Sequence, residues 1–481
     1  MSAIITNKFR KESCDIFIND VIDPETDYFI GIGKTDKWPD TTELPEDSQL
    51  FSAPLPQGTI IEDSDVLDNL ISLVRVTAQD RLIPKNSWRS GRIYKVYDPY
   101  DTLTFDLEEN KYPSYITIND NIYVCLGNNG GGSSTVSPGA SYNTFDTGNH
   151  VLKTTDGYVW AFLQNNAISS PFYTEQFIPV NPDLVDKSPA KSATGGLLYN
   201  FRIENGGSSL DVNLISIKLT GVDENGANKP TVDLMTDERF NVTIGGGNSS
   251  IQSITYDDII TDVLTGYSKA SVQVYSEGTL VDTVVIKPLV APIDGFGASP
   301  RSDLPSFYAG CYASFKGTVD GEALIDAPIR QISLIKNPER SLDSPSASDD
   351  GDQYSDEEAL DASNYIQFTP DTLANIFATG SLISQGDAVA YVDKYDIANQ
   401  RIYFHSNSNN EVNYNTFNAD QNITVTTIDG ASTETYDDIK VAAIVNSEYV
   451  HNTGEVLFID HRKKIMRNID QTEDIKIVIQ F

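Results

Sequence analysis

Short runs of apolar and β-branched residues recur along the chain, and residues that favour turns, chiefly Gly, Asn and Asp, separate them. The run 28–32 is apolar throughout, which predicts a buried strand. Two runs at 115–118 and 121–125 flank Asn119-Asp120, an arrangement that predicts a β-hairpin. The same pattern predicts strands at 158–163, 214–219, 271–275, 281–286, 330–335, 388–392, 402–405, 423–427 and 475–479. We therefore expect a mainly β fold.

Helical periodicity is rare, and it predicts two short helices. The first spans about 64–76, with Ser64 or Asp63 as its cap. Its apolar positions fall on one face of a helix: Val66, Leu67, Leu70, Ile71 and Val74. The second begins at Pro370, a residue suited to the first turn of a helix, and ends at Gly380.

The charge of the chain narrows the choice of partners. Its 481 residues include 34 Lys and Arg against 69 Asp and Glu, which gives a net charge of −35 at pH 7. This balance disfavours binding to nucleic acid or to an anionic membrane, so the expected partners are other proteins. No apolar run is long enough to span a bilayer, and residues 1–10 lack the apolar region of a signal peptide. We expect the chain to fold in the cytosol.

One segment is similar to a nucleotide-binding motif. Gly31-Ile32-Gly33-Lys34-Thr35 follows a predicted strand and ends like a P-loop. A P-loop needs a second glycine five positions before the glycine of Gly-Lys-Thr, and Tyr28 occupies that position. The following Pro39 also disfavours the long helix that the motif requires. We therefore interpret the segment as a corner between a strand and a turn.

The residue types that bind metals or act in catalysis do not occur at the sequence spacings that such sites require. Cys14, Cys125 and Cys311 fit no metal or redox motif and are interpreted as reduced, semi-buried thiols. The four histidines have no ligand spacing: His150, His405, His451 and His461. The acidic run 349–352 lacks the register of a calcium loop and is interpreted as solvated. The sequence predicts no catalytic, cofactor-binding or metal-binding residue, no cofactor and no enzyme activity.

Several short segments together resemble one protein family. The N-terminal ones are 4–12, which contains Thr6-Asn7-Lys8-Phe9-Arg10, then 28–35, Lys37-Trp38-Pro39, the predicted helix from Ser64, 82–88, Asp98-Pro99-Tyr100 and Gly157-Tyr158-Val159-Trp160. The later ones are 330–338, which ends in Asn337-Pro338, then Asn452-Thr453-Gly454-Glu455, and Asp470-Gln471-Thr472-Glu473 with the alternating run up to Phe481. In this order they resemble the baseplate wedge proteins encoded by gene eight of T4-like bacteriophages.

The resemblance covers roughly residues 1–185, 293–345 and 447–481 and implies a structural role. It implies a β-sandwich scaffold with a few short helices and α+β character at its margins. It also implies a homodimer that contacts the wedge proteins of genes six, seven and ten. This structural subunit would assemble in the host cytoplasm, reside in the tail baseplate of the virion, and move as a nearly rigid body when the baseplate opens.

The resemblance suggests a division of the chain into scaffold and insertions. The expected scaffold segments are 1–190, 293–364 and 447–481, and the expected β-rich insertions are 191–292 and 365–446. Three basic clusters fall in the scaffold and are candidates for contact with acidic neighbours. These clusters are Lys8, Arg10 and Lys11; Arg89, Arg92 and Lys95; and Arg462, Lys463, Lys464 and Arg467. Solvated surface is the simpler interpretation of the same residues.

Two other functions remain open. β-rich insertions with exposed tyrosines suit a receptor-binding module that contacts host glycans, and the candidates are Tyr391, Tyr395, Tyr403 and Tyr414. A tail-associated polysaccharide depolymerase would instead need a pair of carboxylates in a cleft. With 69 acidic residues the sequence singles out no such pair.

Overall fold

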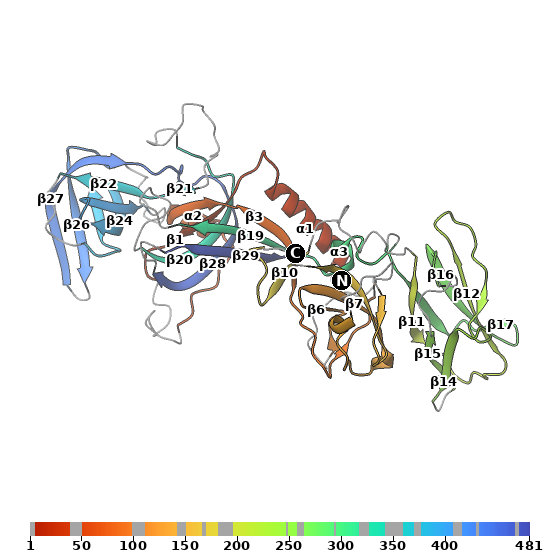
Figure 1. Cartoon of the computed structure of the whole chain (residues 1–481). Helices are drawn as coiled ribbons and strands as arrows, with labels where there is room; N and C mark the ends of the chain where they lie inside the picture. Colours follow the sequence, from red (N-terminus) through yellow and green to blue (C-terminus); the bar gives the residue numbers. More distant parts are fainter. Residues whose placement is uncertain are drawn as a thin grey trace. The chain divides into compact units, whose positions relative to one another are not determined.

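The fold is mainly β, as predicted, with half of the residues in strands and 9% in helices. The computed structural model describes residues 5–38, 51–98, 111–141, 151–165, 170–180, 196–246, 249–256, 264–292, 295–316, 327–341, 359–369, 377–406, 416–429, 432–466 and 471–481. Within these ranges the strands form antiparallel sheets, one short parallel pair and one small barrel (Figure 1).

The chain divides into two compact units, each built from segments that are distant in the sequence. Unit 1 comprises Met1–Asp15, Asp80–Ala309 and Ile479–Phe481, and unit 2 comprises Ile16–Gln79 and Gly310–Val478. The division falls within four elements: α1 (Asn7–Val21), β3 (Ala78–Pro84), β19 (Tyr308–Phe315) and β29 (Glu473–Gln480). Helix α1 was not predicted, although Thr6 Oγ1 accepts a hydrogen bond from the Phe9 backbone N–H at 3.3 Å, as an N-cap does.

The first part of unit 1 is a sheet in the order β6-β7-β9-β8. Its strands are β6 (Tyr115–Ile118), β7 (Asn121–Asn128), β8 (Val151–Lys153) and β9 (Tyr158–Asn165). The predicted hairpin is confirmed, and both of its turn residues adopt positive φ, 45° at Asn119 and 65° at Asp120. Smaller elements accompany this sheet: β4 (Ile93–Tyr94) with β5 (Lys111–Tyr112), η2 (Asn129–Gly131), η3 (Pro138–Ser141), β10 (Phe177–Pro179) and α3 (Pro300–Asp303).

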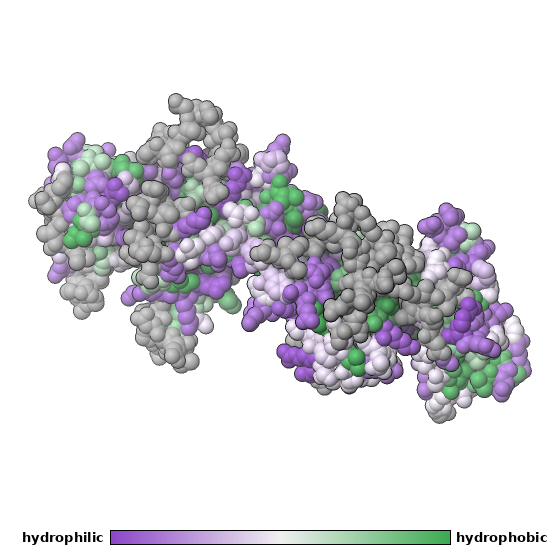
Figure 2. Space-filling model, viewed as in Figure 1, coloured by the Kyte–Doolittle hydropathy of each residue, from purple (hydrophilic) through white to green (hydrophobic). Residues whose placement is uncertain are grey.

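The second part of unit 1 spans residues 196–292 and contains three small sheets, yellow to green in Figure 1. They are β11 (Leu198–Asn205) with β18 (Val285–Val290); β13 (Val232–Asp233), β12 (Ile215–Val222), β16 (Lys269–Ser276) and β17 (Thr279–Leu280); and β14 (Phe240–Gly245) with β15 (Ser250–Tyr256). Figure 2 shows apolar surface on this part, whose exposed apolar side chains include Val212, Leu214, Leu280 and Val285.

One strand predicted in this part is wrong. The run 281–286 is interrupted by a turn at Asp282 and Thr283, and β18 begins only at Val285. Two polar residues in a row favour a turn, but the valines on both sides conceal it in the apolar pattern.

Unit 2 contains a five-stranded antiparallel sheet in the order β21-β2-β1-β20-β28. The strands are β1 (Tyr28–Gly33), β2 (Leu70–Arg75), β20 (Pro328–Lys336), β21 (Ala359–Asp361) and β28 (Glu455–Met466). Phe29, Leu73, Ile335 and Leu360 form its core and are fully buried. The central strand β1 is buried along its whole length, as its apolar run predicts.

The helix predicted at 64–76 is wrong in its position. Helix α2 spans Ile60–Asp68, and Leu70 to Arg75 form strand β2 instead. Five of the six residues of β2 are buried, so side chains on both faces of the strand are covered, and such a run also fits the apolar spacing of a helix. The cap is Thr59, whose side chain accepts a hydrogen bond from the Glu62 N–H, and not Ser64 or Asp63.

Unit 2 also contains a closed six-stranded barrel within residues 364–445, blue in Figure 1. Its strands are β22 (Asn364–Phe368), β25 (Arg401–His405), β24 (Ala388–Asp396), β23 (Leu382–Gln385), β26 (Asn422–Asp429) and β27 (Ser432–Val445), in barrel order. Its interior is filled by alternating apolar side chains, including Ile366, Val392, Ile402 and Val425. Of the predicted helix 370–380, residues 370–376 lie outside the described residues and 377–380 are not helical.

Candidate functional site: a buried histidine between two aspartates

The segment similar to a P-loop is a tight corner at the end of β1. A Cβ atom on Gly33 would lie 2.2 Å from the Asn69 carbonyl oxygen, and one on Gly31 would lie 2.6 Å from Leu70 Cδ2. These glycines therefore permit close packing of β1 on β2, which agrees with the interpretation as a strand-to-turn corner. Lys34 has a positive φ of 59°, and its backbone N–H donates to the Asn69 carbonyl oxygen. No helix follows within the described residues up to 38.

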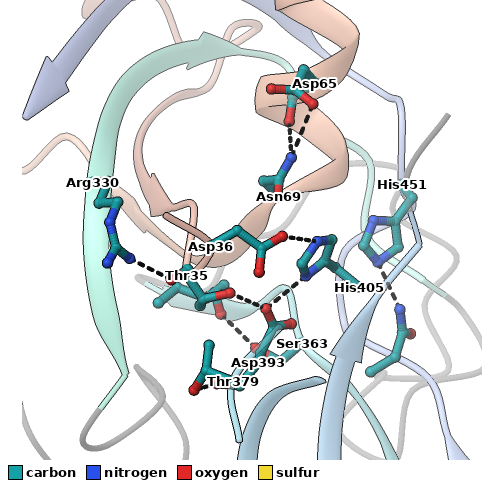
Figure 3. Close-up of polar contacts among 12 residues, drawn as sticks. Thr35, Asp36, Asp65, Asn69, Arg330, Ser363, Thr379, Asp393, His405 and His451 are labelled. Carbon is teal, nitrogen blue, oxygen red and sulfur yellow. Dashed lines mark hydrogen bonds and ion pairs between the residues drawn. The ribbon is translucent and has the colours of Figure 1, made fainter. Parts of the chain in front are cut away.

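The corner places Thr35 and Asp36 against two strands of the barrel (Figure 3). His405, at the end of β25, lies between two carboxylates. Its Nδ1 is 2.6 Å from Asp393 Oδ1 on β24, and its Nε2 is 3.3 Å from Asp36 Oδ2. The side chains of His405 and Asp393 are almost fully buried, while that of Asp36 is 29% exposed.

Further hydrogen bonds fix this group in place. The Thr35 hydroxyl donates to Asp393 Oδ1, and the Thr379 hydroxyl donates to the backbone carbonyl oxygen of Asp393 at 3.1 Å. The buried Arg330 of β20 donates from Nη1 to the Thr35 carbonyl oxygen. Sheet, corner and barrel are thus joined by one polar network in the interior of unit 2.

The two carboxylates determine the charge of His405. Burial alone would lower the pKa of this imidazole, but Asp393 and Asp36 outweigh burial and raise the pKa to about 10. Burial would likewise raise the pKa of Asp36, yet the hydrogen bond and charge of His405 hold it below its ordinary value. At neutral pH His405 is therefore an imidazolium that faces the carboxyl groups of Asp393 and Asp36.

A second histidine in unit 2 shows the opposite behaviour. Burial lowers the pKa of His451, and the positive charge of His405 contributes in the same direction. Asn364 Nδ2 donates to His451 Nε2 at 3.0 Å, a bond that a neutral imidazole accepts. Asp68 and Asp393 act in the opposite direction on the pKa of His451 but do not outweigh burial, whereas at His405 the two carboxylates do outweigh it.

The geometry of His405 does not suit acid–base catalysis. In a catalytic triad one imidazole nitrogen faces a carboxylate and the other faces a nucleophile. Here both nitrogens face carboxylates, and the nearby Thr35 hydroxyl donates to Asp393 instead. An imidazole with a pKa of about 10 also stays protonated at neutral pH and cannot accept a proton. The group can stabilise an arrangement of the chain, but it is not a general base.

The three described tyrosines among those proposed for glycan binding each pack against a different aromatic neighbour. Tyr391 stacks on His405 with ring centroids 5.7 Å apart, Tyr395 packs against Phe377 at 5.4 Å, and Tyr403 packs against Tyr365 at 5.4 Å. All three are half-buried in the barrel wall. Tyr414 lies outside the described residues.

The remaining candidates from the sequence are the cysteines, the possible metal ligands and the apolar segments. Cys14, Cys125 and Cys311 are buried free thiols. The described part of the chain contains no group of three or more His, Cys, Asp or Glu side chains that could hold a metal ion, and His150 and the acidic run 349–352 lie outside it. No helix among the described residues has the length and apolar character needed to cross a membrane.

The three basic clusters differ in their surroundings. In the first, Lys8 Nζ is 3.8 Å from Glu12 Oε1, and Lys11 donates to the Ser302 carbonyl oxygen at 2.5 Å. In the second, Arg89 is exposed, while Arg92 and Lys95 are half-buried. In the third, Arg462, Lys463 and Lys464 are all exposed at the end of β28, and Arg467 lies outside the described residues.

Comparisons with known proteins add no assignment. No protein-family model matches the sequence, and no curated protein matches it.

Proposed function

We propose that this chain is a non-enzymatic structural subunit of the baseplate wedge in the contractile tail of a T4-like bacteriophage. In this role it is a homodimeric connector that holds the wedge proteins of genes six, seven and ten together. It belongs to the tail baseplate of the virion and assembles in the host cytoplasm. Its activity is the burial and pairing of surfaces, and no bond is made or broken.

The proposal depends on the sequence resemblance, and one structural observation supports it. The ranges that the resemblance covers lie at the beginning, in the middle and at the end of the chain, and in unit 2 they contribute the neighbouring strands β1, β20 and β28. If the resemblance arose by chance, the matching segments would not be expected to form strands that pair with each other. Segments inherited as parts of a common scaffold would be expected to do so.

The turns next to these strands, at Asp27, Asn337 and Gly454, also contact each other closely. Asn337 and Asp27 exchange two hydrogen bonds, from Asn337 N to Asp27 O at 2.7 Å and from Asp27 N to Asn337 Oδ1 at 2.8 Å. A Cβ atom on Gly454 would lie 2.7 Å from Ile335 Cγ2, and the φ of Gly454 is 86°. The Asn-Pro and Thr-Gly-Glu motifs of the resemblance therefore occupy positions with strict local requirements.

The buried network gives this connector a physical basis for rigid-body movement. The Asp36–His405–Asp393 group connects the barrel to the corner after β1, and separating the barrel from the sheet would break the Asp36–His405 ion pair and the hydrogen bond from Thr35 to Asp393. A connector that transmits movement between neighbours needs such internal stiffness, because a loose joint would absorb the displacement.

The alternative role, a receptor or glycan binder, has weaker support. The three described candidate tyrosines are half-buried, and each ring packs against a neighbour within the chain, which leaves less of it for a sugar ring. A glycan array probed with the full chain distinguishes the two roles. Binding that a Tyr403→Ala substitution removes would favour the receptor role.

The proposal is tested first on the purified chain and then in assembly. Light scattering across micromolar concentrations should find a dimer, and co-expression with the three neighbouring wedge proteins should yield a stable complex that contains this chain. A clean monomer that fails to join the complex would contradict the proposal. Detection of polysaccharide hydrolysis by the pure chain would contradict its non-enzymatic part.

A further inference from the structure

The end of strand β28 has an unusual surface for a strand. Arg462, Lys463, Lys464, Ile465 and Met466 are all exposed, although a strand that covers a core normally buries every second residue. Ile465 is 37% exposed and Met466 is 52% exposed. In the described part of the chain β28 is the last strand of its sheet and pairs with β20 alone. This end of β28 therefore presents apolar and basic side chains at a sheet edge.

A bulge produces this exposure. Gln331 is paired with His461 and Ile329 with Ile465, so the three residues between His461 and Ile465 stand opposite the single residue Arg330. A bulge of this kind bends the strand and turns its side chains outward. The three residues in the bulge are the three cations Arg462, Lys463 and Lys464.

The base of the bulge is held firmly by unit 2. Trp38 Nε1 donates to the Arg462 carbonyl oxygen at 2.9 Å, and the Trp38 ring lies 4.5 Å from the His461 ring. His461 Nδ1 lies 3.0 Å from the Pro54 carbonyl oxygen, and Gln331 Nε2 lies 3.1 Å from His461 Nε2. The exposed strand end is thus a fixed feature, and a partner can bind it without first ordering it.

The positive charge of residues 462–464 favours an acidic partner. The chain carries a net charge of −35, so three consecutive exposed cations at a sheet edge form a local exception to a repulsive surface. Arg462 is only partly neutralised, by Asp460 at 2.5 Å, and its side chain remains 55% exposed. An acidic segment would gain from these cations, whereas another basic surface would be repelled.

We propose that the 462–466 end of β28 docks an acidic, extended segment of a partner protein, which adds to the sheet edge as a further strand. Main-chain hydrogen bonds beyond the Arg462 carbonyl oxygen, which Trp38 already occupies, supply the common part of the binding, and carboxylates facing Arg462 and Lys464 supply the selectivity. Ile465 and Met466 provide apolar contact beside the charges. The inference does not depend on which assembly the chain belongs to.

An acidic protein segment fits this surface better than a nucleic acid. A polyanion long enough to contact several cations would also approach the surrounding acidic surface of the chain, and its phosphates would be repelled there. A short peptide strand needs only the edge itself. The apolar pair Ile465 and Met466 has a counterpart in a peptide but none in a phosphate backbone.

The test uses the full chain and fluorescein-labelled ten-residue peptides in which Glu or Asp alternates with Val, Ile or Thr. Fluorescence anisotropy should detect binding at low salt that weakens as salt is raised. The double substitution Lys463→Glu and Lys464→Glu should weaken it about tenfold or more, since two attractions become repulsions. The matched control, Lys269→Glu with Lys440→Glu, changes the charge equally at two other exposed strand positions and should bind as wild type.

Hydrogen exchange distinguishes strand addition from simple charge attraction. Peptide binding should slow exchange of backbone amides in 462–466, because a new strand pairs with them. Three results would overturn the inference: no peptide binds, the control loses binding as much as the double variant, or exchange in 462–466 is unchanged. Equal or tighter binding of a fluorescein-labelled single-stranded oligonucleotide of twenty nucleotides would also overturn it. None of these measurements involves dimer or wedge assembly, so failure here is separate from failure of the proposed function.

Discussion

Replacing His405 by Gln should destabilise unit 2 in a manner that depends on pH. The substitution leaves the carboxylates of Asp36 and Asp393 without the cation between them, and removing one member of a buried ionic group costs about 3–5 kcal/mol. The pKa of His405 gives a second figure. The interval between 6.5 and about 10, at about 1.4 kcal/mol per pH unit, corresponds to roughly 5 kcal/mol as an upper bound.

The sign of the pH dependence follows from proton binding. Between pH 6.5 and about 10 the folded chain retains a proton on His405 that the unfolded chain releases. The stabilisation is therefore complete below pH 6.5 and is lost as the pH rises through about 10. The difference in unfolding free energy between wild type and His405→Gln should be several kcal/mol at pH 6.5 and much smaller at pH 10.

Urea unfolding followed by circular dichroism at a series of pH values measures this difference. Comparison with a variant removes the contributions of other groups that titrate in the same range. The matched control is His451→Gln, which replaces a half-buried histidine whose lowered pKa keeps it neutral, so its effect should not change between pH 7 and pH 10. A penalty for His405→Gln that is the same at pH 6.5 and pH 10 would refute the assignment of an imidazolium at this position.

Two further substitutions test other parts of unit 2 and its surroundings. Gly33→Ala places a Cβ atom 2.2 Å from the Asn69 carbonyl oxygen and should lower stability by about 1–3 kcal/mol, whereas Gly245→Ala, whose nearest neighbour would be 3.5 Å away, should have a much smaller effect in thermal unfolding. Similar melting temperatures for the two variants would contradict the close-packed corner. Burial raises the pKa of Asp361 to about 7, so the folded chain holds a proton there that the unfolded chain releases above pH 3.8, and stability is lost as the pH rises through 7. Asp361→Asn should therefore stabilise the chain at pH 8 more than at pH 5 in urea unfolding, and the reverse order would show that this carboxyl is ionised throughout.

Local patterns predicted individual strands, whether their partners are close in the sequence or distant. The 115–125 hairpin follows from Asn119-Asp120 and its flanking apolar runs, and β1 follows from an uninterrupted apolar segment. The same patterns failed at α2 and β2, because Val66, Leu67, Leu70 and Val74 fit a helix face and a fully buried strand equally well. The Thr59–Glu62 spacing of a capping box was the signal that would have placed the helix correctly.

The candidate site could not be predicted from the sequence because its residues come from distant segments. Asp393 and His405 lie on adjacent strands of one hairpin, so their proximity follows once β24 and β25 are known. Asp36 is hundreds of residues away and reaches them only because the corner after β1 meets the barrel. No local pattern encodes that contact, and an isolated histidine in an apolar run is an unremarkable core residue until its partners are known.

The central claim, that the chain is a structural subunit of the baseplate wedge, is tested most directly by electron microscopy of virions in which this chain carries a small C-terminal tag. Antibody labelling should mark the baseplate, and a map of the baseplate should contain two copies of the chain in each of its wedges. Labelling confined to the tips of tail fibres, or virions that lack the chain and still assemble complete baseplates, would contradict the claim.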